Sequence, residues 1–281
     1  MEMNRECVCK MLEQMDQHLR TDLLKKEGKL QEEKLWENTY IELQIRKRNN
    51  QESFSLKDHI RAMVYAMISG GVPWDRVAQD MDSETRCMGA VDKIFCEYDT
   101  EQLLKCTPEQ LGEGLKEIHC SLRFSMQQMT GLLSNIPKLA EIEKEYGSID
   151  AYYRKFIEAD DTMHTLIKAL SDAKSKDKMK RLGIPLACEY LRNVGYNLPK
   201  PDRHIRRILG SRYLAFSEKK EVSEIEAIDL VVELAKLAGK SVAETDYILW
   251  SYCADGYGEI CTQKNPKCEI CAANTICKRG L

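Results

Sequence analysis

The sequence has no long apolar run, and this absence limits the kind of protein that it encodes. The longest apolar stretch covers residues 62–68, whereas a membrane-spanning helix needs about 20 such residues. The first residues, MEMNRECVCK, lack the apolar segment of a secretory signal, so we expect a cytoplasmic protein. Repeats and low-complexity tracts are also missing. With 43% hydrophobic and 31% charged residues, the composition is that of a globular protein and excludes a disordered or collagen-like chain.

Alternating β-branched residues are scarce, whereas Leu, Met, Glu and Lys dominate. These residue types favour helix, so the sequence predicts an all-α fold. A length of 281 residues suggests two domains, at roughly 150 residues for each. We expect a strongly apolar helix over residues 56–68 and helices that start at Thr107 and Ser148. Residues 1–50 hold ten basic and ten acidic residues and predict a helical extension that faces solvent.

Twelve cysteines are present, and without an export signal we expect them to be reduced thiols or metal ligands. Four of them lie within seventeen residues, in the pattern Cys-x6-Cys-x2-Cys-x5-Cys: Cys261, Cys268, Cys271 and Cys277. Soft thiolate ligands select zinc or an iron–sulfur cluster. A single Cys-x2-Cys with wide arms suits a cubane better than one ion, so the spacing predicts a [4Fe–4S] cluster, with zinc or free thiols as alternatives.

This spacing differs from that of ferredoxins, which argues against electron transfer as the main role. We expect the other eight cysteines to be inert thiols. Cys253 is the nearest of them to the four, but four ligands are already supplied.

Basic residues are concentrated in one segment although the whole chain has a net charge of −3. Residues 174–212 contain eleven lysines and arginines and only three acidic residues. Such a basic island in an otherwise acidic chain indicates a site for a polyanion. The alternative is a solvated, lysine-rich loop.

A helix–hairpin–helix pattern lies within this basic segment. The residues before Gly183 have the pattern of a charged helix, and Leu186, Tyr190 and Val194 mark an apolar helical face after it. We expect Gly183 to supply a tight turn and Pro185 to take the first helical position. The backbone N–H groups at such a turn can bind a DNA phosphate without reading sequence. An ordinary αα-hairpin would give a similar pattern.

Asp202 stands immediately before the apolar helical series Ile205, Ile208 and Leu209. The simplest interpretation is a helix N-cap. The functional interpretation is a carboxylate presented to a bound nucleotide. The two interpretations are compatible, because the helix dipole keeps a capping carboxylate ionised. We expect His204 to be structural or to contact a phosphate rather than to act as a base.

The order of hairpin, aspartate segment and cysteine loop resembles the endonuclease III branch of the helix–hairpin–helix DNA glycosylase superfamily. Residues 191–196 (LRNVGY) and 202–205 (DRHI) are more similar to the archaeal-type 8-oxoguanine glycosylases. The resemblance covers residues 178–277 and extends from about residue 55. It does not include residues 1–50.

This resemblance implies two all-α domains with a DNA-binding cleft between them. One is a six-helix domain, residues 54–195, that ends in the hairpin. The other is residues 196–281, which carry the [4Fe–4S] cluster loop 261–277 and pack with a charged N-terminal segment, residues 1–53. Asp202 matches the catalytic aspartate of the family. The expected DNA contacts are Gly183, Ile184, Pro185, Lys180, Arg181, Arg203, His204, Lys264 and Lys267.

The sequence departs from the family at three places. Bifunctional members carry a hairpin lysine that attacks the sugar, but Pro185 stands at that position, and Lys178 and Lys180 are expected on the preceding helix. Arg181 replaces the first hairpin glycine or proline. The segment around Gly70 has no glutamine to fill the gap left by a flipped base; Trp74 would be the substitute, with core packing as its alternative.

The sequence therefore predicts a monofunctional DNA glycosylase of base-excision repair that cleaves the N-glycosidic bond of a flipped base with Asp202, and that has weak or no lyase activity. Its partner would be double-stranded DNA with a damaged or mismatched base, and we expect a monomer, near the nucleoid in a prokaryote. The main alternative is a DNA-structure-binding protein without catalysis. A nuclease with a carboxylate pair is a further alternative, for which the sequence shows no motif.

Overall fold

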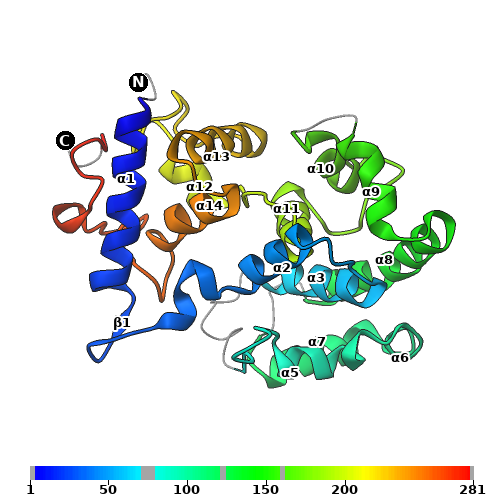
Figure 1. Cartoon of the computed structure of the whole chain (residues 1–281). Coiled ribbons are helices and arrows are strands. Elements are labelled where there is room, and N and C mark those ends of the chain that lie inside the picture. Colours follow the sequence, from blue (N-terminus) through cyan, green and yellow to red (C-terminus); the bar gives the residue numbers. More distant parts are fainter. Residues whose placement is uncertain (1–3, 71–79, 121–124, 159–161, 279–281) are drawn as a thin grey trace. The chain divides into compact units, whose positions relative to one another are not determined.

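The computed structural model describes residues 4–70, 80–120, 125–158 and 162–278 (Figure 1). The described chain is 59% helix and 2% strand, so the predicted all-α class is confirmed. None of the described helices is long and apolar enough to cross a membrane. The chain divides into two compact units. Unit 1 comprises Met1–Leu43 and Asn197–Leu281, and unit 2 comprises Gln44–Tyr196.

Unit 2 is built from helices that follow one another along the chain. α2 (Tyr40–Asn49) crosses the boundary between the units. The others are α3 (Leu56–Ile68), α5 (Gly89–Ile94), the 3-10 turn η4 (Cys96–Tyr98), α6 (Thr100–Leu103), α7 (Pro108–Glu117), α8 (Ser125–Tyr146), α9 (Ile149–Ile157), α10 (His164–Ser171) and α11 (Ile184–Asn193).

Three predicted helix starts in unit 2 are confirmed. α3 covers the predicted residues, and its N-cap Ser55 forms a capping box with Asp58. The Thr107 side chain accepts a hydrogen bond from the Gln110 amide at the start of α7. Ser148 does the same for the Ala151 amide in α9. Each cap satisfies an amide that would otherwise lack a partner, which is why these helices begin where they do.

The core of unit 2 forms where α3 packs against α11. α3 is buried almost all round, and it contributes the imidazole of His59, which lies 2.7 Å from the Tyr190 hydroxyl on α11. The Tyr190 hydroxyl also contacts that of Tyr153 on α9, at 3.0 Å. Burial lowers the pKa of His59 to about 4, so this imidazole is neutral at pH 7. A neutral polar network therefore joins three helices without the cost of a buried charge.

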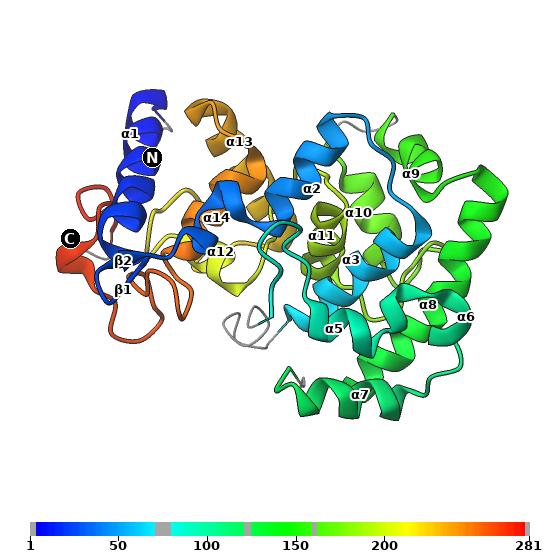
Figure 2. The ribbon, with the colours of Figure 1, turned by 60° about the horizontal axis from the view of Figure 1, so that its bottom comes forward.

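Unit 1 combines the two ends of the chain (Figure 2). Its N-terminal part contains α1 (Arg5–His18), the π-turn η1 (Leu19–Leu23), β1 (Lys25–Lys26), β2 (Lys29–Leu30) and the 3-10 turns η2 (Glu32–Lys34) and η3 (Trp36–Asn38). Its C-terminal part contains α12 (Arg203–Ile208), α13 (Glu224–Ala238), α14 (Val242–Ser251) and the 3-10 turn η5 (Cys268–Ile270).

The prediction that residues 1–50 form a solvent-facing helical extension is wrong. α1 packs against α13 and α14, and its side chains Val8, Met11, Leu12 and Met15 are buried. Helical spacing places these side chains on one face, and the C-terminal helices supply the apolar surface that covers it. The charged residues of α1 occupy its other face.

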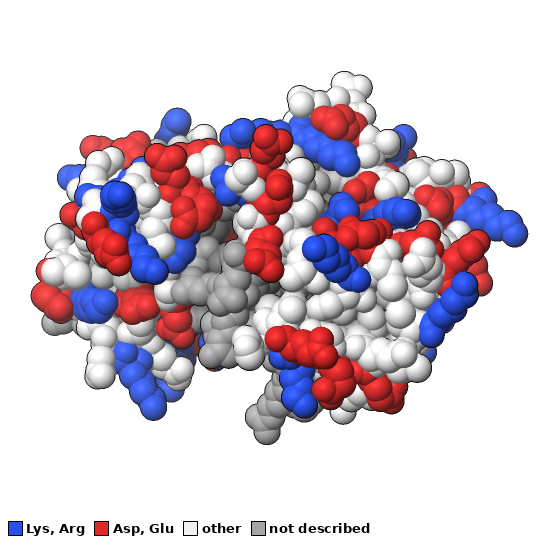
Figure 3. Space-filling model, turned by 90° about the horizontal axis from the view of Figure 1, so that it is seen from below, with Lys and Arg blue, Asp and Glu red and all other residues white. Residues whose placement is uncertain are grey.

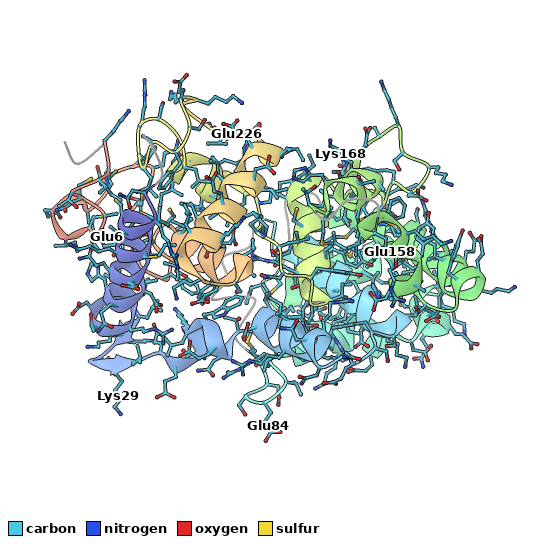
Figure 4. The ribbon with its side chains drawn as sticks, turned by 45° about the horizontal axis from the view of Figure 1, so that its top comes forward. Glu6, Lys29, Glu84, Glu158, Lys168 and Glu226 are labelled. Atoms are coloured by element: carbon cyan, nitrogen blue, oxygen red, sulfur yellow. The ribbon has the colours of Figure 1, made fainter. Side chains whose placement is uncertain are left out.

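A short β-hairpin interrupts the N-terminal segment, and helical periodicity did not predict it. β1 and β2 pair antiparallel, and Glu27 and Gly28 between them have φ angles of 52° and 77°. This left-handed pair of residues matches the twist of a tight hairpin. Lys29 is exposed, and its side chain points away from the hairpin (Figure 4).

Charged side chains of both signs mix on one face of the molecule. On the face shown in Figure 3, blue and red side chains are interspersed over the described residues. This view shows no continuous basic band among the residues that the structure describes.

Gly195 and Gly147 offer a matched test of packing in unit 2. Both have left-handed φ angles, 82° and 80°. A Cβ atom at Gly195 would lie 2.4 Å from the Gln44 carbonyl oxygen, whereas a Cβ atom at Gly147 would meet nothing within 4 Å. We expect Gly147→Ala to lower the free energy of unfolding by about 1 kcal/mol and Gly195→Ala to lower it by about 3 kcal/mol or more, both measured by urea denaturation. Equal losses would contradict the close approach.

Candidate functional site

The hairpin segment differs from its prediction in the part before Gly183. α10 ends at Ser171, and residues 172–183 form turns rather than the predicted charged helix. The Asp172 side chain accepts a hydrogen bond from the Lys174 amide at 2.9 Å. The Ser175 hydroxyl accepts one from the Asp177 amide at 3.1 Å. These side chains compete with the backbone carbonyls of a helix, and this competition explains the turns.

The left-handed residue of the hairpin is Arg181, not Gly183. Arg181 has a φ of 66°, whereas Gly183 has a φ of −81° and a ψ of 176°. The predicted glycine turn is therefore wrong in position by two residues. The resemblance places a glycine or proline at position 181, and a left-handed conformation favours glycine there.

Packing against α8 holds Arg181 in this conformation. A Cβ atom on Gly131 would lie 2.5 Å from Cγ of Arg181, so only glycine permits this approach. The Arg181 guanidinium donates a hydrogen bond to Oε1 of Gln127, one turn earlier on α8, at 2.7 Å. α8 therefore supports the hairpin along its length.

Two lysines hold the loop before α11 through backbone carbonyls. Nζ of Lys178 donates to the carbonyl of Ser171 at 2.5 Å and also to that of Leu182. Nζ of Lys138 on α8 donates to the carbonyl of Lys176 at 2.6 Å. Burial lowers the pKa of both Lys138 and Lys178. These two ammonium groups close the loop and are not spread over its outer surface.

Lys180 is exposed and fixed by α8. Its amide donates to Oδ1 of Asn135 at 2.7 Å, and Nδ2 of Asn135 donates to the Lys180 carbonyl at 3.0 Å. Its ammonium lies 3.2 Å from the Ser134 hydroxyl. The sequence analysis missed this support from α8. A polar stripe at helical spacing, formed by Gln127, Ser134 and Lys138, could have indicated that this face of the helix contacts the hairpin segment.

The N-terminus of α11 has no side-chain cap. Gly183 is exposed, and Ile184, Pro185 and Leu186 are half-buried. α11 begins at Ile184, so Pro185 takes the second helical position rather than the predicted first. The first amides of a helix have no partner within it, and they carry the positive end of the helix dipole. This end of α11 can therefore accept an anion.

Asp202 is the N-cap of α12, as the sequence predicts. Its Oδ1 accepts hydrogen bonds from the His204 amide at 2.7 Å and the Ile205 amide at 3.2 Å. The carboxylate is half-buried, and among the described residues its Oδ2 accepts no hydrogen bond. The segment before it is tied to the first turns of α14: Asp246 Oδ1 accepts from the Lys200 amide at 3.1 Å.

Arg203 and His204 follow this carboxylate in the chain and differ in their exposure to solvent: Arg203 is exposed and His204 is half-buried. Nε of Arg203 lies 3.4 Å from Nε2 of His204. Burial lowers the pKa of His204, so its imidazole is neutral at pH 7.

The cysteine segment is anchored to α12 and to the end of α14. The Arg207 guanidinium on α12 donates to the Cys261 carbonyl at 2.6 Å. The Tyr252 carbonyl, which follows α14, accepts from the Cys261 amide at 2.8 Å. At the other end, the Lys278 amide donates to the Tyr213 carbonyl at 2.9 Å. The segment and Asp202 therefore belong to one connected part of unit 1.

The four cysteine thiols are half-buried. Burial raises the pKa of Cys271 to about 11, and the thiols of Cys261, Cys277 and Cys268 contribute to this shift. No three His, Cys, Asp or Glu side chains within the described residues are arranged to hold a metal ion. The donor set has the thiol chemistry that a cluster needs, although the thiols do not converge on one point. The predicted [4Fe–4S] cluster stays a prediction.

Cys253 is closer to this segment than the sequence indicated. Its thiol is buried and hydrogen-bonds to the thiol of Cys261, which raises the pKa of Cys253 together with burial. Lys264 and Lys267 are exposed in the loop between the first two cysteines. Unit 1 thus contains Asp202, Arg203, His204, both loop lysines and the four cysteines. The predicted hairpin contacts are in unit 2, and Trp74 lies outside the described residues.

These features define a class: a helical protein in which a turn-rich, basic segment leads into the uncapped helix α11 and an aspartate caps α12. Comparison with curated proteins identifies a protein to which this chain is similar. The chain is a distant homologue of an 8-oxoguanine DNA glycosylase/AP lyase from Aquifex aeolicus (strain VF5) and is 32% identical to it over 161 residues. The match covers 56% of this chain and 66% of that protein, slightly less than two thirds of its length. No family model and no solved structure matches the chain.

Proposed function

We propose that this protein is a monofunctional DNA glycosylase of base-excision repair, with Asp202 as its catalytic carboxylate. The observation that carries the proposal is the rigid placement of Asp202, held by two amides of α12 at the position that the resemblance identifies as catalytic. The distant homology to a DNA glycosylase supports the same reaction class. The substrate would be double-stranded DNA with a damaged or mismatched base.

The chemistry follows from the carboxylate at this cap. Cleavage of the bond between base and sugar leaves an oxocarbenium-like sugar. An ionised Asp202 would stabilise that positive charge or would activate the water that attacks it. The His204 and Ile205 amides of α12 fix the direction of the carboxylate. Because one carboxylate oxygen accepts both amides, the other is available to the sugar or to water.

The hairpin would anchor the DNA backbone. The uncapped amides of α11 suit a phosphate oxygen, and Lys180 and Arg181 lie next to them in the chain. Such contacts position a duplex without reading its sequence. Flipping of the nucleotide costs a few kcal/mol and is easiest for a damaged or mispaired base. Lys264 and Lys267 would bind further DNA phosphates. Arg203 and His204 would contact the DNA next to Asp202.

Absence of lyase activity follows from the residues at the hairpin. Pro185 cannot form a Schiff base, because its nitrogen is part of the backbone amide. The ammonium of Lys178 is held by two carbonyls. The ammonium of Lys180 is held at Ser134. Neither lysine occupies the position of the family nucleophile.

We further propose that Cys261, Cys268, Cys271 and Cys277 hold a [4Fe–4S] cluster. When bound, such a cluster would cross-link residues 261–277 and so give the loop a fixed shape. Arg207 would then transmit the position of Cys261 to α12, through the hydrogen bond to the Cys261 carbonyl. The cluster would serve structure, and no step of the reaction needs it.

A panel of lesion-bearing duplexes tests the proposed function. Duplexes with 8-oxoguanine, uracil, thymine glycol, alkylated purines or mismatches would be incubated with the protein and then split, with and without hot alkali. We expect strand breaks only after alkali. Asp202→Asn should lower the single-turnover rate by about 100-fold or more and change the free energy of unfolding by less than about 0.5 kcal/mol, because asparagine caps helices as well as aspartate does.

Two further results decide between the alternatives. Asp202→Ala removes the cap as well as the carboxylate, so it should be as inactive as Asp202→Asn and less stable by about 1 kcal/mol. Tight binding to the lesions without any alkali-labile product would replace the glycosylase by the DNA-structure-binding protein. A borohydride-trapped covalent complex that Lys180→Ala abolishes would show lyase activity and overturn the monofunctional assignment.

Gly183→Ser tests the phosphate anchor without loss of the fold. The backbone of Gly183 already has N-cap angles, and a Cβ atom there has only Cδ of Pro185 near it, at 4.0 Å. A serine hydroxyl would therefore accept the Leu186 amide and should raise stability slightly. The same hydrogen bond competes with a phosphate, so the Kd for DNA should rise by about tenfold, measured by fluorescence anisotropy. Gly183→Ala adds the Cβ without an acceptor and should weaken binding less; an unchanged Kd for Gly183→Ser would exclude the anchor.

Neighbouring cysteines provide the test of the cluster. We expect about four irons for each purified chain and the visible absorbance of a cubane. Cys261→Ala should lose most of both signals, whereas Cys253→Ala, its hydrogen-bonded neighbour, should keep them. Stoichiometric zinc in place of iron, or an iron content that neither variant changes, would refute the proposed ligands.

A further inference from the structure

A pair of cysteines in unit 2 lies outside everything described so far. Sγ of Cys96 and Sγ of Cys106 are 3.8 Å apart. Cys96 begins the turn η4, and Cys106 lies between α6 and α7, so the two thiols reach each other across α6. Both residues are half-buried, which leaves them accessible to small molecules. The sequence predicts both to be inert thiols.

The position of Cys96 is fixed by the residues on either side of it. Cys96, Glu97 and Tyr98 have left-handed φ angles of 53°, 48° and 59°, which non-glycine residues adopt only when their surroundings impose it. Phe95 and Tyr98 are completely buried and stack on each other. The Tyr98 hydroxyl donates to Oδ1 of Asp92 at 2.6 Å. The turn therefore cannot swing the thiol away from its partner.

The position of Cys106 is fixed in the same way. Its amide donates to the carbonyl of Leu103 at 3.1 Å, and Leu103 is buried. Its thiol lies 3.6 Å from the Gln102 carbonyl. The next residue, Thr107, caps α7. Two thiols held in contact by separate anchors have a high effective concentration for each other.

We propose that Cys96 and Cys106 form a reversible dithiol–disulfide site, oxidised by thiol–disulfide exchange with a low-molecular-weight disulfide. One protein thiol, as the thiolate, attacks a sulfur of the small disulfide and releases one small thiol. The second protein thiol then attacks the mixed disulfide and releases the other small thiol. The protein loses two electrons and two protons, and the small disulfide is reduced to two thiols.

The product is a cross-link around α6. The disulfide would join the η4 turn to the start of α7 and close a short loop. Burial and the hydrogen bond to Cys106 raise the pKa of Cys96. This inference does not depend on the proposed DNA chemistry.

Peptide mapping with oxidised glutathione tests the proposal on the full-length protein. The protein would be equilibrated with oxidised glutathione, alkylated and digested with trypsin, which cleaves after Lys93, Lys105 and Lys116. Cys96 and Cys106 then fall on separate peptides, residues 94–105 and 106–116. We expect these two peptides to be recovered as a linked pair, formed about tenfold faster than any other cysteine pair, and to separate again with dithiothreitol.

Single variants complete the test. Cys106→Ser should abolish the linked pair and leave Cys96 alkylated or glutathionylated, and Cys96→Ser should give the mirror result. Cys87→Ser removes another half-buried thiol of unit 2 and should leave the linked pair intact. Recovery of both peptides in wild-type protein as separate alkylated or glutathionylated species, or linkage of either one to other cysteines in preference, would overturn the proposal.

Discussion

The packing of α3 against α11 is the contact on which unit 2 and its hairpin depend. α11 carries the hairpin at its N-terminus and the sequence LRNVGY at its C-terminal end, so its position decides where both lie. The buried hydrogen bond between His59 and Tyr190 fixes the register of the two helices, because an unpaired polar group in this core would cost roughly 1–3 kcal/mol. Gly195 then lets the chain pass next to the Gln44 carbonyl. The hairpin is thus presented by a rigid support.

Basic residues in the hairpin segment serve two different purposes. Lys178 donates to backbone carbonyls and, together with Lys138 of the neighbouring helix α8, closes the loop, so it adds little to the outer surface. Lys180 and Arg181 are exposed and are held in place by α8. A count of charges along the sequence cannot separate these two groups, because it contains no information on which carbonyls lack partners. The electrostatic footprint of the segment is therefore smaller than its composition indicates.

Hydrogen bonds between side chains and the main chain connect the Asp202 carboxylate and the cysteine segment within unit 1. Asp202 caps α12, and Arg207 of the same helix donates to the Cys261 carbonyl. A change in the cysteine loop would therefore move α12 and its cap together. This arrangement gives the loop a structural role near the proposed catalytic carboxylate, in addition to any contact between its lysines and DNA.

The sequence alone determined the all-α class, the starts of α3, α7 and α9, and the cap at Asp202, because helix periodicity and capping are local. The predicted cofactor, catalytic role and DNA contacts rest on residue types and on resemblance, and they stay predictions. Only the tertiary structure decided that α1 is buried, that residues 172–183 are turns, and that Arg181 takes the left-handed conformation. It also decided that Cys96 meets Cys106. These outcomes depend on which surfaces of distant segments meet, and short-range patterns in a sequence do not contain that information.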